Sequence, residues 1–564
     1  MSDTPSDTNA PQAEKQSVSE KLMGIRTRTD LKLKPTPHLK TTFTDFSGNE
    51  RDLSIRYYQV QGILHLIFMK RFLLGDDTGL GKCKPLDSLV LTDRGLLRLG
   101  DLAPRGETVP DQFYPLTQPT SVWTGFQAGW QPIKHYYCGG TKPTKRIVTR
   151  RGYETAGSWV HPVWMRLPGG ERFQQLQEVQ PGSYACLSRA GAAFPRSEPF
   201  LPLPDRATFD RATKFYSVPD KLTPELARLL GYIVAEGWTN GRYGVHIAQD
   251  QMEHPEIHAD IEQLCLSVLS KAPADGQNKD QTLNLSSVYL RAYLQGLGVD
   301  RVLSADKCVP WPIFQGTSES VAAFLRGYFD GEASVCGGVL EVSSASEQLL
   351  REVQILLLRF GILSSRNPKV IKGNTYWRLA LCGQDAADFN TKIGLLTPSK
   401  KEALQALCSK RRNANLDVVP FAQAAVQALR MEIKAQVTMS GSNGNRTGSG
   451  IKQFGVSFEK TLNNIRNEGR NPTYTFLDHI LEVARQVGVG HTAAYAEVQD
   501  ICAHRFFYDP VVSILDGDEP VADIEVDDPC HSFVADGFIT TTPFRPSLPC
   551  VTCGNGPPTS KPSC

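Results

Sequence analysis

The chain has 564 residues, of which 40% are hydrophobic and 21% charged, and its formal net charge is +2. This length exceeds what one hydrophobic core supports and predicts roughly three or four domains. The near-neutral charge excludes a chain that is basic throughout, so any nucleic-acid surface is expected to be local. No apolar run is long enough to cross a bilayer, the polar start lacks a signal peptide, and the 13 cysteines are irregularly spaced. We therefore expect a cytoplasmic protein with reduced thiols and no membrane partner.

The first part of the chain contains two different kinds of sequence. Residues 1–22 are rich in Ser, Asp, Glu and Gln and almost lack large apolar side chains, which predicts disorder. Residues 53–74 are apolar and aromatic and lead directly into a glycine-rich loop, a pattern that predicts a strand before the loop. We accordingly separate a disordered segment, 1–22, from a folded segment, 23–82.

The glycine-rich loop fits the phosphate-binding pattern G-x-x-x-x-G-K with Gly75, Gly79, Gly81 and Lys82. In such a loop the glycine amides surround a phosphate group and the lysine reaches the outer phosphates. The next residue should supply a hydroxyl to Mg²⁺, but it is Cys83, whose thiol is a poor ligand for this ion. ATP hydrolysis is therefore not expected. With YYQVQGILHLI upstream, the segment resembles the start of an SNF2-type helicase interrupted in its Walker A loop, and no later helicase motif follows.

Cys83 opens CKPLDSLVLTDRGLLRLGDL, a series of short alternating segments with turn residues that predicts β-structure. This stretch resembles the N-terminal block of inteins, which begins with Cys and leads into the Hint fold, an all-β, horseshoe-like splicing domain. The resemblance implies that the Cys83 sulfur attacks the Lys82 carbonyl and forms a thioester, without any cofactor. β-like segments continue to about residue 210, so residues 83–215 are assigned to the first part of this domain.

Two further segments resemble intein blocks. RGYETAGSWVHPVW resembles block B, with Ser158 and His161 in its T-x-x-H pattern, and PVADIEVDDPCHSFVADGFI resembles block F, with Asp523 and His531. The resemblance implies that His161 protonates the leaving amide nitrogen with help from Ser158, that Asp523 assists thioester formation or transfer, and that His531 assists the late steps. Taken alone, such residues are more often structural. Residues 505–539 are assigned to the second part of the Hint domain.

Two segments, LARLLGYIVAEG and AAFLRGYFDGEA, share one pattern. Both resemble the LAGLIDADG motif of homing endonucleases, and their alignment makes Glu236 and Glu332 equivalent. In that family two helices pack along small residues, here Gly231 and Gly327, and bring two carboxylates together over double-stranded DNA. The resemblance implies that the two glutamates hold a divalent metal, Mg²⁺, for two phosphodiester cuts. Residues 216–405 are assigned to this α+β endonuclease domain.

The neighbouring residues agree with this interpretation. Thr223 and Pro224 are a capping hydroxyl and an N1 proline, which predict a helix start before the first motif. Lys307, in KCVP, matches a lysine common in intein endonucleases. The segment LEVSSASEQLLREVQILLLRFGI predicts a strand and then a helix after the second motif. The sequence departs from the family in having Glu instead of the usual Asp in both motifs and Ala333 instead of the final glycine. The alternative is a pair of amphipathic helices in an unrelated domain.

Residues 406–504 carry no motif. The segment SGSNGNRTGSG at 440–450 has the composition of a flexible linker, and NPTYTFLDHILEVARQVG after it predicts a helix. We treat 406–504 as a helical and linker region and as a candidate DNA-contacting segment.

The end of the chain lacks a residue that splicing needs. An intein should finish with His-Asn, because the asparagine side chain cyclises to release the branched intermediate, but Thr541 and Thr542 stand at these positions. The codons ACC-CAC-AAC-ACC encode Thr-His-Asn-Thr, and loss of one C gives the Thr-Thr-Thr-Pro found at 540–543. The tail 540–564 is therefore interpreted as frameshifted, and the chain is expected to form the thioester without completing splicing.

Together these segments predict a multidomain chain: an all-β Hint domain split by an α+β LAGLIDADG endonuclease and preceded by a short helicase fragment. The expected partner is double-stranded DNA, with the uninterrupted helicase gene as the natural target. Two motifs in one chain favour a monomer. Three alternatives stay open: a DNA-dependent ATPase, a degenerate relic that only binds DNA, and a Hint protein that cleaves itself without splicing.

Overall fold

The computed structural model describes most of the residues that carry these motifs. Residues are described over the ranges 82–126, 129–189, 193–210, 214–240, 244–275, 282–299, 304–409, 417–440, 454–527 and 531–542, together with the backbone of two strands at 38–44 and 50–56. Several predicted features lie outside the described residues: the disordered segment 1–22, the three glycines of the phosphate loop, all of the linker at 440–450 except Ser440, and the tail from Pro543.

The chain divides into two compact units. The first contains Met1–Gly79, and its described part is an antiparallel pair of strands, β1 (His38–Thr44) and β2 (Glu50–Arg56). The second contains Leu80–Arg545. All predicted site residues that the structure describes lie in this second unit.

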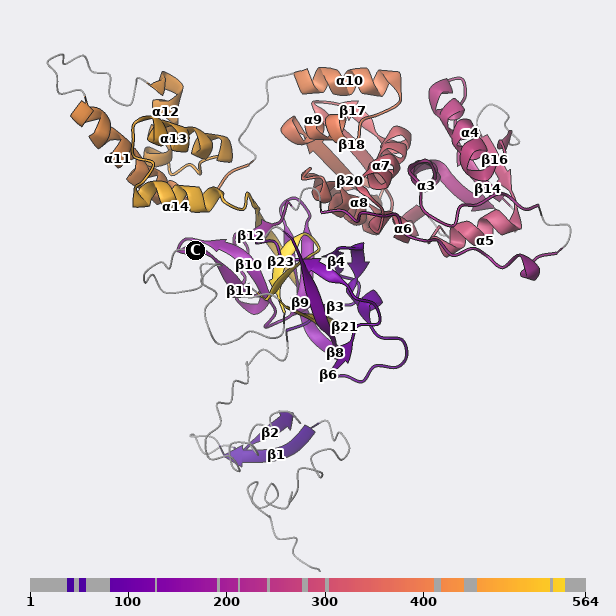
Figure 1. The fold of residues 1–564 in the computed structure, drawn as a ribbon, viewed down its shortest axis with the longest axis horizontal. Coiled ribbons are helices and arrows are strands. Elements are labelled where there is room, and N and C mark those ends of the chain that lie inside the picture. The colour runs from indigo at the N-terminus through magenta and orange to yellow at the C-terminus, as the bar shows by residue number, and fades with distance from the viewer. Residues whose placement is uncertain are drawn as a thin grey trace, which may run out of the picture. The chain divides into compact units, whose positions relative to one another are not determined.

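A large antiparallel sheet in the second unit combines strands from two distant parts of the sequence (Figure 1). The early strands are β3 (Lys84–Pro85), β4 (Leu89–Thr92), β5 (Gly95–Arg98), β6 (Gln112–Pro115), β7 (Ser121–Trp123), β8 (Trp130–Thr149), β9 (Glu154–Ser158), β10 (Pro162–Leu167), β11 (Gly170–Gln175) and β12 (Tyr184–Leu187). The late strands are β21 (Phe507–Val526), β22 (Ser532–Ala535) and β23 (Phe538–Thr541). Late strands pair directly with early ones, because β21 lies between β8 and β3 and β23 pairs with β10 and β12.

The two longest strands, β8 and β21, organise this sheet. They pair antiparallel from Val511 opposite Thr149 to Val526 opposite Ile133, with three irregularities of register. Such bulges bend a strand and increase its twist. The bent strands can then pair with different neighbours along their length: β8 pairs with β7 and β9, and β21 pairs with β12 and β3. The end of β21 then pairs with β3, so the residues next to Cys83 are held by a strand more than 400 positions later in the sequence.

Between these two sets of strands lies a domain built from two copies of one order of elements. The first copy contains α3 (Pro224–Glu236), β13 (Gly237–Asn240), β14 (Gly244–Ala248), α4 (Pro255–Leu269), β15 (Ala274–Asp275), β16 (Thr282–Ser286) and α5 (Val288–Gly296). The second, after the short α6 (Trp311–Phe314), contains α7 (Ser318–Glu332), β17 (Ser334–Cys336), β18 (Val339–Ser344), α8 (Glu347–Arg359), β19 (Ser365–Ile371), β20 (Asn374–Cys382) and α9 (Gly383–Lys392), followed by α10 (Pro398–Ser409). The two four-stranded sheets of the described residues, β13-β14-β16-β15 and β17-β18-β20-β19, have the same strand order.

The helix starts follow the capping rules that the sequence indicates. The Thr223 side chain accepts a hydrogen bond from the Leu226 amide at 3.2 Å, and Pro224 occupies the first helical position of α3, as predicted. Ser346 caps α8 in the same way through the Leu349 amide at 3.1 Å. The predicted strand and helix after the second motif are β18 and α8.

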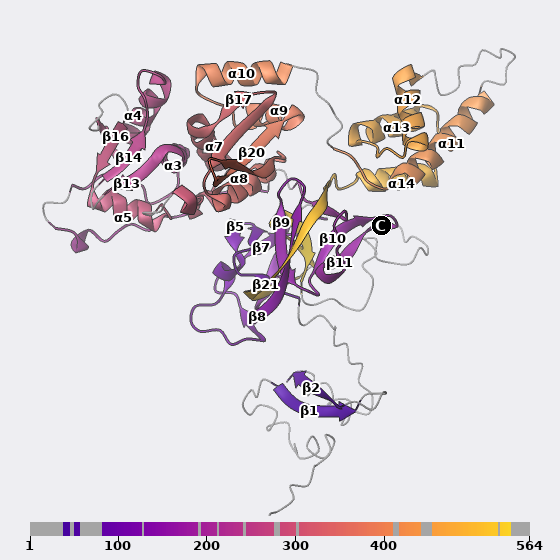
Figure 2. The same ribbon diagram turned by 180° about the vertical axis from the view of Figure 1, so that it is seen from behind.

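Helix α8 lies beside the large sheet (Figure 2), and its polar side chains contact that sheet. Arg98 of β5 donates to the buried Glu352 at 2.8 Å, and Arg351 donates to Glu154 of β9 at 2.8 Å. Removing one partner of such a partly buried ion pair leaves an uncompensated charge and is costly. These pairs therefore fix the second copy against β5 and against β9, the strand that also carries Ser158.

A third group of helices precedes β21. It contains α11 (Gln423–Ser440), α12 (Val456–Asn467), α13 (Tyr474–Gln486) and α14 (Ala493–Cys502). Apolar residues of these helices, including Leu429, Leu477 and Val498, are buried in the main hydrophobic core. None of the helices in the described part of the chain is both long and apolar enough to cross a bilayer.

Candidate functional site

The first candidate site lies where α3 and α7 pack against each other. A Cβ atom on Gly231 would lie 2.3 Å from the Phe324 carbonyl oxygen, and one on Gly327 would lie 2.4 Å from the Arg228 carbonyl oxygen. Each glycine therefore lies against the backbone of the opposite helix, at a distance that no side chain permits. The close approach expected from the two aligned motifs is present.

Glu236 and Glu332 end these two helices. A Cβ atom on Gly331 would lie 3.5 Å from Glu236 Cγ, which places the Glu236 side chain against the last turn of α7. Burial and the nearby Glu236 carboxylate raise the pKa of Glu332 to about 7, since both effects disfavour a second negative charge. The helix pair thus concentrates two carboxylates in a partly desolvated place.

Two lysines bind the ends of the same helices. Lys307 donates to the carbonyls of Val234 and Ala235 at 2.8 and 3.1 Å. Lys400 donates to the carbonyls of Asp330 and Gly331 at 2.6 and 3.3 Å. The two ammonium groups therefore occupy corresponding positions, since each binds the carbonyls one and two residues before a motif glutamate.

Both lysines also interact electrostatically with the glutamates. Burial lowers the pKa of Lys307 and of Lys400, and the carboxylates of Glu236 and Glu332 partly oppose this effect. Lys307 was predicted from its sequence context, whereas Lys400 was missed. The position of Lys400 in the repeat could have indicated it. Lys400 follows the last helix of the second copy, α9, just as Lys307 follows the last helix of the first copy, α5.

The other acid of the second motif has a structural role. Asp330 is buried and accepts hydrogen bonds from the amides of Leu396 and Thr397 at 2.9 and 3.1 Å. Its carboxylate therefore anchors the loop before α10. This leaves Glu332 as the motif acid that faces Glu236.

The second candidate site surrounds Cys83, which is fully buried. The Cys83 amide donates to Ser158 Oγ at 3.1 Å, and the Ser158 amide donates to the Cys83 carbonyl at 2.9 Å. These two hydrogen bonds hold Cys83 on both sides of its α-carbon against the end of β9. The structure thus brings together two of the residues predicted to act in self-processing.

His161 follows Ser158 by one turn and is also fully buried. Its amide donates to the Ser158 carbonyl at 2.8 Å, and its Nε2 forms a short hydrogen bond with the Thr540 hydroxyl. Burial and the charges of Lys84 and Lys82 hold the pKa of His161 well below its ordinary value. The imidazole is therefore neutral near pH 7, and it connects the strand end near Cys83 with the C-terminal strand β23.

Asp523 reaches the same region from β21. Val521 pairs with Pro85 and Ala522 with Lys84, so continuing the antiparallel register by one residue places Asp523 opposite Cys83. Burial raises the pKa of Asp523 well above its ordinary value, although a hydrogen bond from the Ile524 amide and nearby lysines oppose this effect. A carboxyl that is protonated in such surroundings can donate a proton.

The C-terminal strands end beside His531. This residue adopts a left-handed conformation with φ of 44°, and its carbonyl accepts a hydrogen bond from the Thr542 amide at 2.7 Å. Thr541 pairs with Ser532, and its hydroxyl is buried without a hydrogen-bond partner among the described residues. Positions 541 and 542 are thus held next to the segment that begins with His531.

One buried pair near Cys83 was not predicted. Lys84 is fully buried and donates to Thr155 Oγ1 at 2.5 Å and to the Ala156 carbonyl at 3.0 Å, and it pairs with Asp536 at 3.5 Å. Burial lowers the pKa of Lys84, and Asp536 opposes this effect. The pair connects β3, β9 and the β22–β23 turn. Both residues lie in segments that resemble intein blocks, but the resemblance assigns a role to neither of them, and only the sheet brings them together.

Of the predicted phosphate-loop residues, the structure describes only Lys82. Its side chain is nearly buried beside Cys83, with 9% relative exposure. It contributes positive charge around His161 and Asp523. Its place in the fold is therefore at the junction with Cys83.

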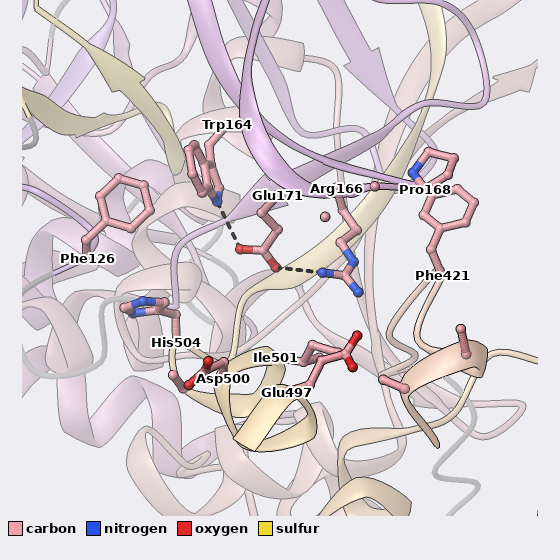
Figure 3. A pocket seen from close by; sticks show the side chains of 15 residues that line it. Phe126, Trp164, Arg166, Pro168, Glu171, Phe421, Glu497, Asp500, Ile501 and His504 are labelled. Atoms are coloured by element: carbon pink, nitrogen blue, oxygen red, sulfur yellow. Dashed lines mark hydrogen bonds and ion pairs between the residues drawn. The ribbon is translucent and has the colours of Figure 1, made fainter. Parts of the chain in front are cut away.

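A cavity of about 630 Å³ is lined by the β10–β11 hairpin and by residues of α11 and α14. Figure 3 shows the side chains that line it. In it the Trp164 indole donates to Glu171 at 3.0 Å, and Glu171 pairs with Arg166 at 3.7 Å. Glu497 and Asp500 come from α14. None of the predicted site residues is among the described residues that line this cavity.

Comparison with known proteins agrees with the helix-pair site. Residues 319–394, which include Glu332 and all of α7 except its first residue, match the family of LAGLIDADG-like domains. The second half of the central domain is therefore similar to a LAGLIDADG-like domain.

Longer alignments extend over most of the chain. It is 26% identical over 468 residues to the replicative DNA helicase DnaB of Rhodothermus marinus, covering 77% of this chain and 44% of that protein. It is 23% identical over 406 residues to the replication factor C small subunit of Thermococcus kodakarensis (69% and 42%) and 25% identical over 354 residues to a glutamine--fructose-6-phosphate aminotransferase of Methanocaldococcus jannaschii (59% and 28%). The chain thus spans less than half the length of each of these relatives.

Some solved structures are similar to part of the chain. The homing endonuclease I-DmoI in complex with DNA and Mn is 20% identical, covering 30% of this chain and 96% of that chain with a TM-score of 0.25. The TvoVMA intein is 15% identical, covering 19% of this chain and 71% of that chain with a TM-score of 0.18.

Proposed function

We propose that this chain is an intein-type homing endonuclease, whose α3–α7 helix pair cleaves double-stranded DNA. The observation that carries the proposal is the convergence of Glu236 and Glu332 at the ends of two helices packed glycine against backbone, within a chain that contains a LAGLIDADG-like domain. Two acids at equivalent positions in two repeated units suit the cleavage of a DNA duplex, in which one phosphodiester bond is cut on each strand.

The donor set suits a hard divalent cation such as Mg²⁺. The raised pKa of Glu332, caused by burial and by Glu236, indicates a carboxyl pair that a bound cation would stabilise, and carboxylate oxygens are the ligands that Mg²⁺ prefers. The described residues contain no group of three or more His, Cys, Asp or Glu side chains placed for a metal. The remaining ligands would therefore be water and DNA phosphate, as is usual for Mg²⁺. When bound, the cation would stabilise charge that develops on the phosphate.

The protein's own residues have separate tasks in this proposal. Glu236 and Glu332 hold the cation, and Lys307 and Lys400 keep the two helix ends in place while adding positive charge beside the scissile phosphates. The β-strands that follow each motif provide contacts to the DNA backbone, which position a protein on a duplex. The candidate target is the uninterrupted helicase gene across its Walker A codons, and a monomer suffices because both motifs lie in one chain.

A glycine substitution tests the helix pair. We expect Gly231→Ala to abolish cleavage, because its Cβ would lie 2.3 Å from the Phe324 carbonyl oxygen and α3 and α7 would have to separate. Gly296→Ala is the matched control, since its Cβ would lie no closer than 3.6 Å to other atoms and alanine favours a helix by about 1 kcal/mol. The assay incubates a duplex carrying the uninterrupted Walker A codons with the chain and Mg²⁺. If Gly231→Ala cuts as well as the unmodified chain, the paired-helix proposal is wrong.

We propose self-processing at Cys83 as a second function. It is supported by the sheet, in which Cys83 is hydrogen-bonded to Ser158, His161 is hydrogen-bonded to Thr540, and Lys84 pairs with Ala522 next to Asp523. The relatives also support it, because proteins with three unrelated names each align with more than half of this chain. A segment shared by proteins of different function is what an inserted element produces.

In this second function the Cys83 thiolate attacks the Lys82 carbonyl, with Ser158 orienting the Cys83 nitrogen. The neutral His161 first accepts a proton and then passes it to the leaving nitrogen, and Asp523 serves as a proton donor. We expect dithiothreitol to release an N-terminal fragment that ends at Lys82, because an external thiol displaces the thioester. Cys83→Ala should remove this cleavage completely, whereas Cys336→Ala, at an exposed cysteine elsewhere, should not change it. Intact mass of both products measures the result, and a thiol-independent fragment, or none, would contradict the proposal.

A further inference from the structure

A lysine that belongs to no recognised motif lies against the sulfur of Cys83. Lys142, on β8, places its Nζ atom 3.9 Å from Cys83 Sγ. The same strand makes room for the sulfur at Gly139, where a Cβ atom would lie 2.8 Å from Sγ. β8 therefore contributes both the space for the thiol and a cation beside it.

The position of the Lys142 ammonium is well defined. It pairs with Asp111 at 3.4 Å and lies 5.5 Å from the centre of the Tyr137 ring, and the Tyr137 hydroxyl donates to Asp111 at 2.7 Å. The Lys142 side chain is only 13% exposed. An ammonium held this way needs no reorganisation when a negative charge develops next to it, which is the condition for effective electrostatic stabilisation.

The surroundings of the sulfur make such a cation useful. Cys83 packs in an apolar cluster with Tyr137 and Val521, and apolar burial disfavours the thiolate, which is the reactive form of cysteine. Other titratable groups around the junction come from several elements: Lys82, Lys84, Asp111, Tyr136, Tyr137, His161 and Asp523. In addition to these groups, Lys142 is a cation in direct contact with the sulfur, with Nζ 3.9 Å from Sγ.

We propose that Lys142 stabilises the Cys83 thiolate and thereby accelerates acyl transfer from the nitrogen to the sulfur of Cys83. The inference rests on the proposed self-processing function. In the step, the thiol proton leaves, a C–S bond forms to the Lys82 carbonyl carbon, the C–N bond to Cys83 breaks, and the nitrogen takes up one proton. Lys142 supplies positive charge and takes no part in the proton transfers.

The pH profile of thiol-induced cleavage tests the inference. Lys142→Met should move the midpoint of the rate profile up by about one pH unit, a roughly tenfold loss of thiolate near pH 7, while the rate at high pH is retained. Lys142→Arg should keep the original midpoint. Asp111→Asn should move it down, because it frees the ammonium from its carboxylate, and asparagine tolerates the φ of 62° at this position.

Lys134→Met is the matched control, because Lys134 lies on the same strand and also pairs with an aspartate, Asp527, at 2.7 Å. It should leave the profile unchanged. If Lys142→Met lowers the rate equally at every pH with the midpoint unmoved, Lys142 has only a structural role and the inference is overturned.

A second readout separates this inference from the function on which it rests. Methyl methanethiosulfonate labels thiolates, and peptide mass spectrometry reports its rate at Cys83, with the exposed Cys336 as internal reference. If the pH profile of Cys83 labelling shifts to higher pH in Lys142→Met, the inference is supported. If, in addition, no variant cleaves, only the self-processing proposal fails. Identical labelling profiles in Lys142→Met and the unmodified chain would overturn the inference.

Discussion

Glu332→Gln is expected to abolish DNA cleavage and, at the same time, to make the folded protein more stable above pH 7. Loss of one cation-binding carboxylate should reduce cleavage by roughly 10³-fold, because a bound metal contributes several kcal/mol to the transition state. The stability gain has a different cause, since burial and Glu236 disfavour the charged form of this side chain. Glutamine keeps the shape and removes the charge.

The pH dependence of this gain follows from the pKa of Glu332, which is raised to about 7 in the folded protein. As pH rises from about 4.5 to about 7, the unfolded chain gives up the proton more readily than the folded one, so stability falls with pH. Glu332→Gln removes this loss. The gain should be about 2 kcal/mol at pH 8 after allowance for partial exposure, and it should vanish below pH 4.5.

Thermal unfolding at pH 4.5 and pH 8 measures the effect, with a rise of roughly 4–8 °C expected only at the higher pH. Glu319→Gln is the control, because Glu319 lies in the first turn of the same helix and is exposed. That variant should cut DNA normally and gain no stability. A Glu332→Gln chain that is less stable at pH 8 would show that the carboxylate is a structural anchor.

The helix-pair site could be predicted because its signals are local. A motif of nine residues contains both the glycine that permits the close approach and the glutamate at the helix end, and a Thr-Pro pair marks the start of α3. The second copy of the motif predicted the other helix of the pair, α7, with Gly327 and Glu332. Asp330 shows the limit of this reasoning. Sequence alone does not distinguish an acid that binds two loop amides, as Asp330 does, from one that faces the equivalent acid of the other motif, as Glu332 does.

The Cys83 site could be predicted only in part, because its residues are joined by strand pairing over long distances. Ser158 and His161 belong to one short block, and the structure brings both to Cys83 or to the strand beside it. Lys142 lies in no such block, and Lys84 lies next to Cys83 in the first block without an assigned role. Their positions depend on the register of β8 and β3 against β21, and register is determined by the whole buried face of a sheet.

Restoring the expected ending should convert a chain that stays joined at its C-terminal junction into one that cleaves there. We expect the triple variant Thr541→His, Thr542→Asn, Pro543→Thr to release the segment after residue 542. The reason is chemical: an asparagine amide nitrogen can attack its own backbone carbonyl and displace residue 543 as a free amine, and threonine has no such nitrogen. Intact mass should show the loss of residues 543–564.

The fold around this junction supports the expectation. The Thr542 amide is held by the His531 carbonyl at 2.7 Å, His161 contacts Thr540 in the same strand, and the buried Thr541 hydroxyl has no hydrogen-bond partner among the described residues. An unsatisfied buried hydroxyl costs about 1–3 kcal/mol, which is consistent with a position shaped for a different polar side chain.

Two controls separate the parts of this result. The triple variant in a Cys83→Ala background should still cleave at the C-terminal junction, because cyclisation needs no thioester, and the same chain with Ala instead of Asn at position 542 should not. Retained DNA cleavage in all variants reports that they fold. If the folded triple variant keeps its full mass, the terminal threonines are not the cause of the missing step, and the interpretation of the ending as a lost His-Asn is wrong.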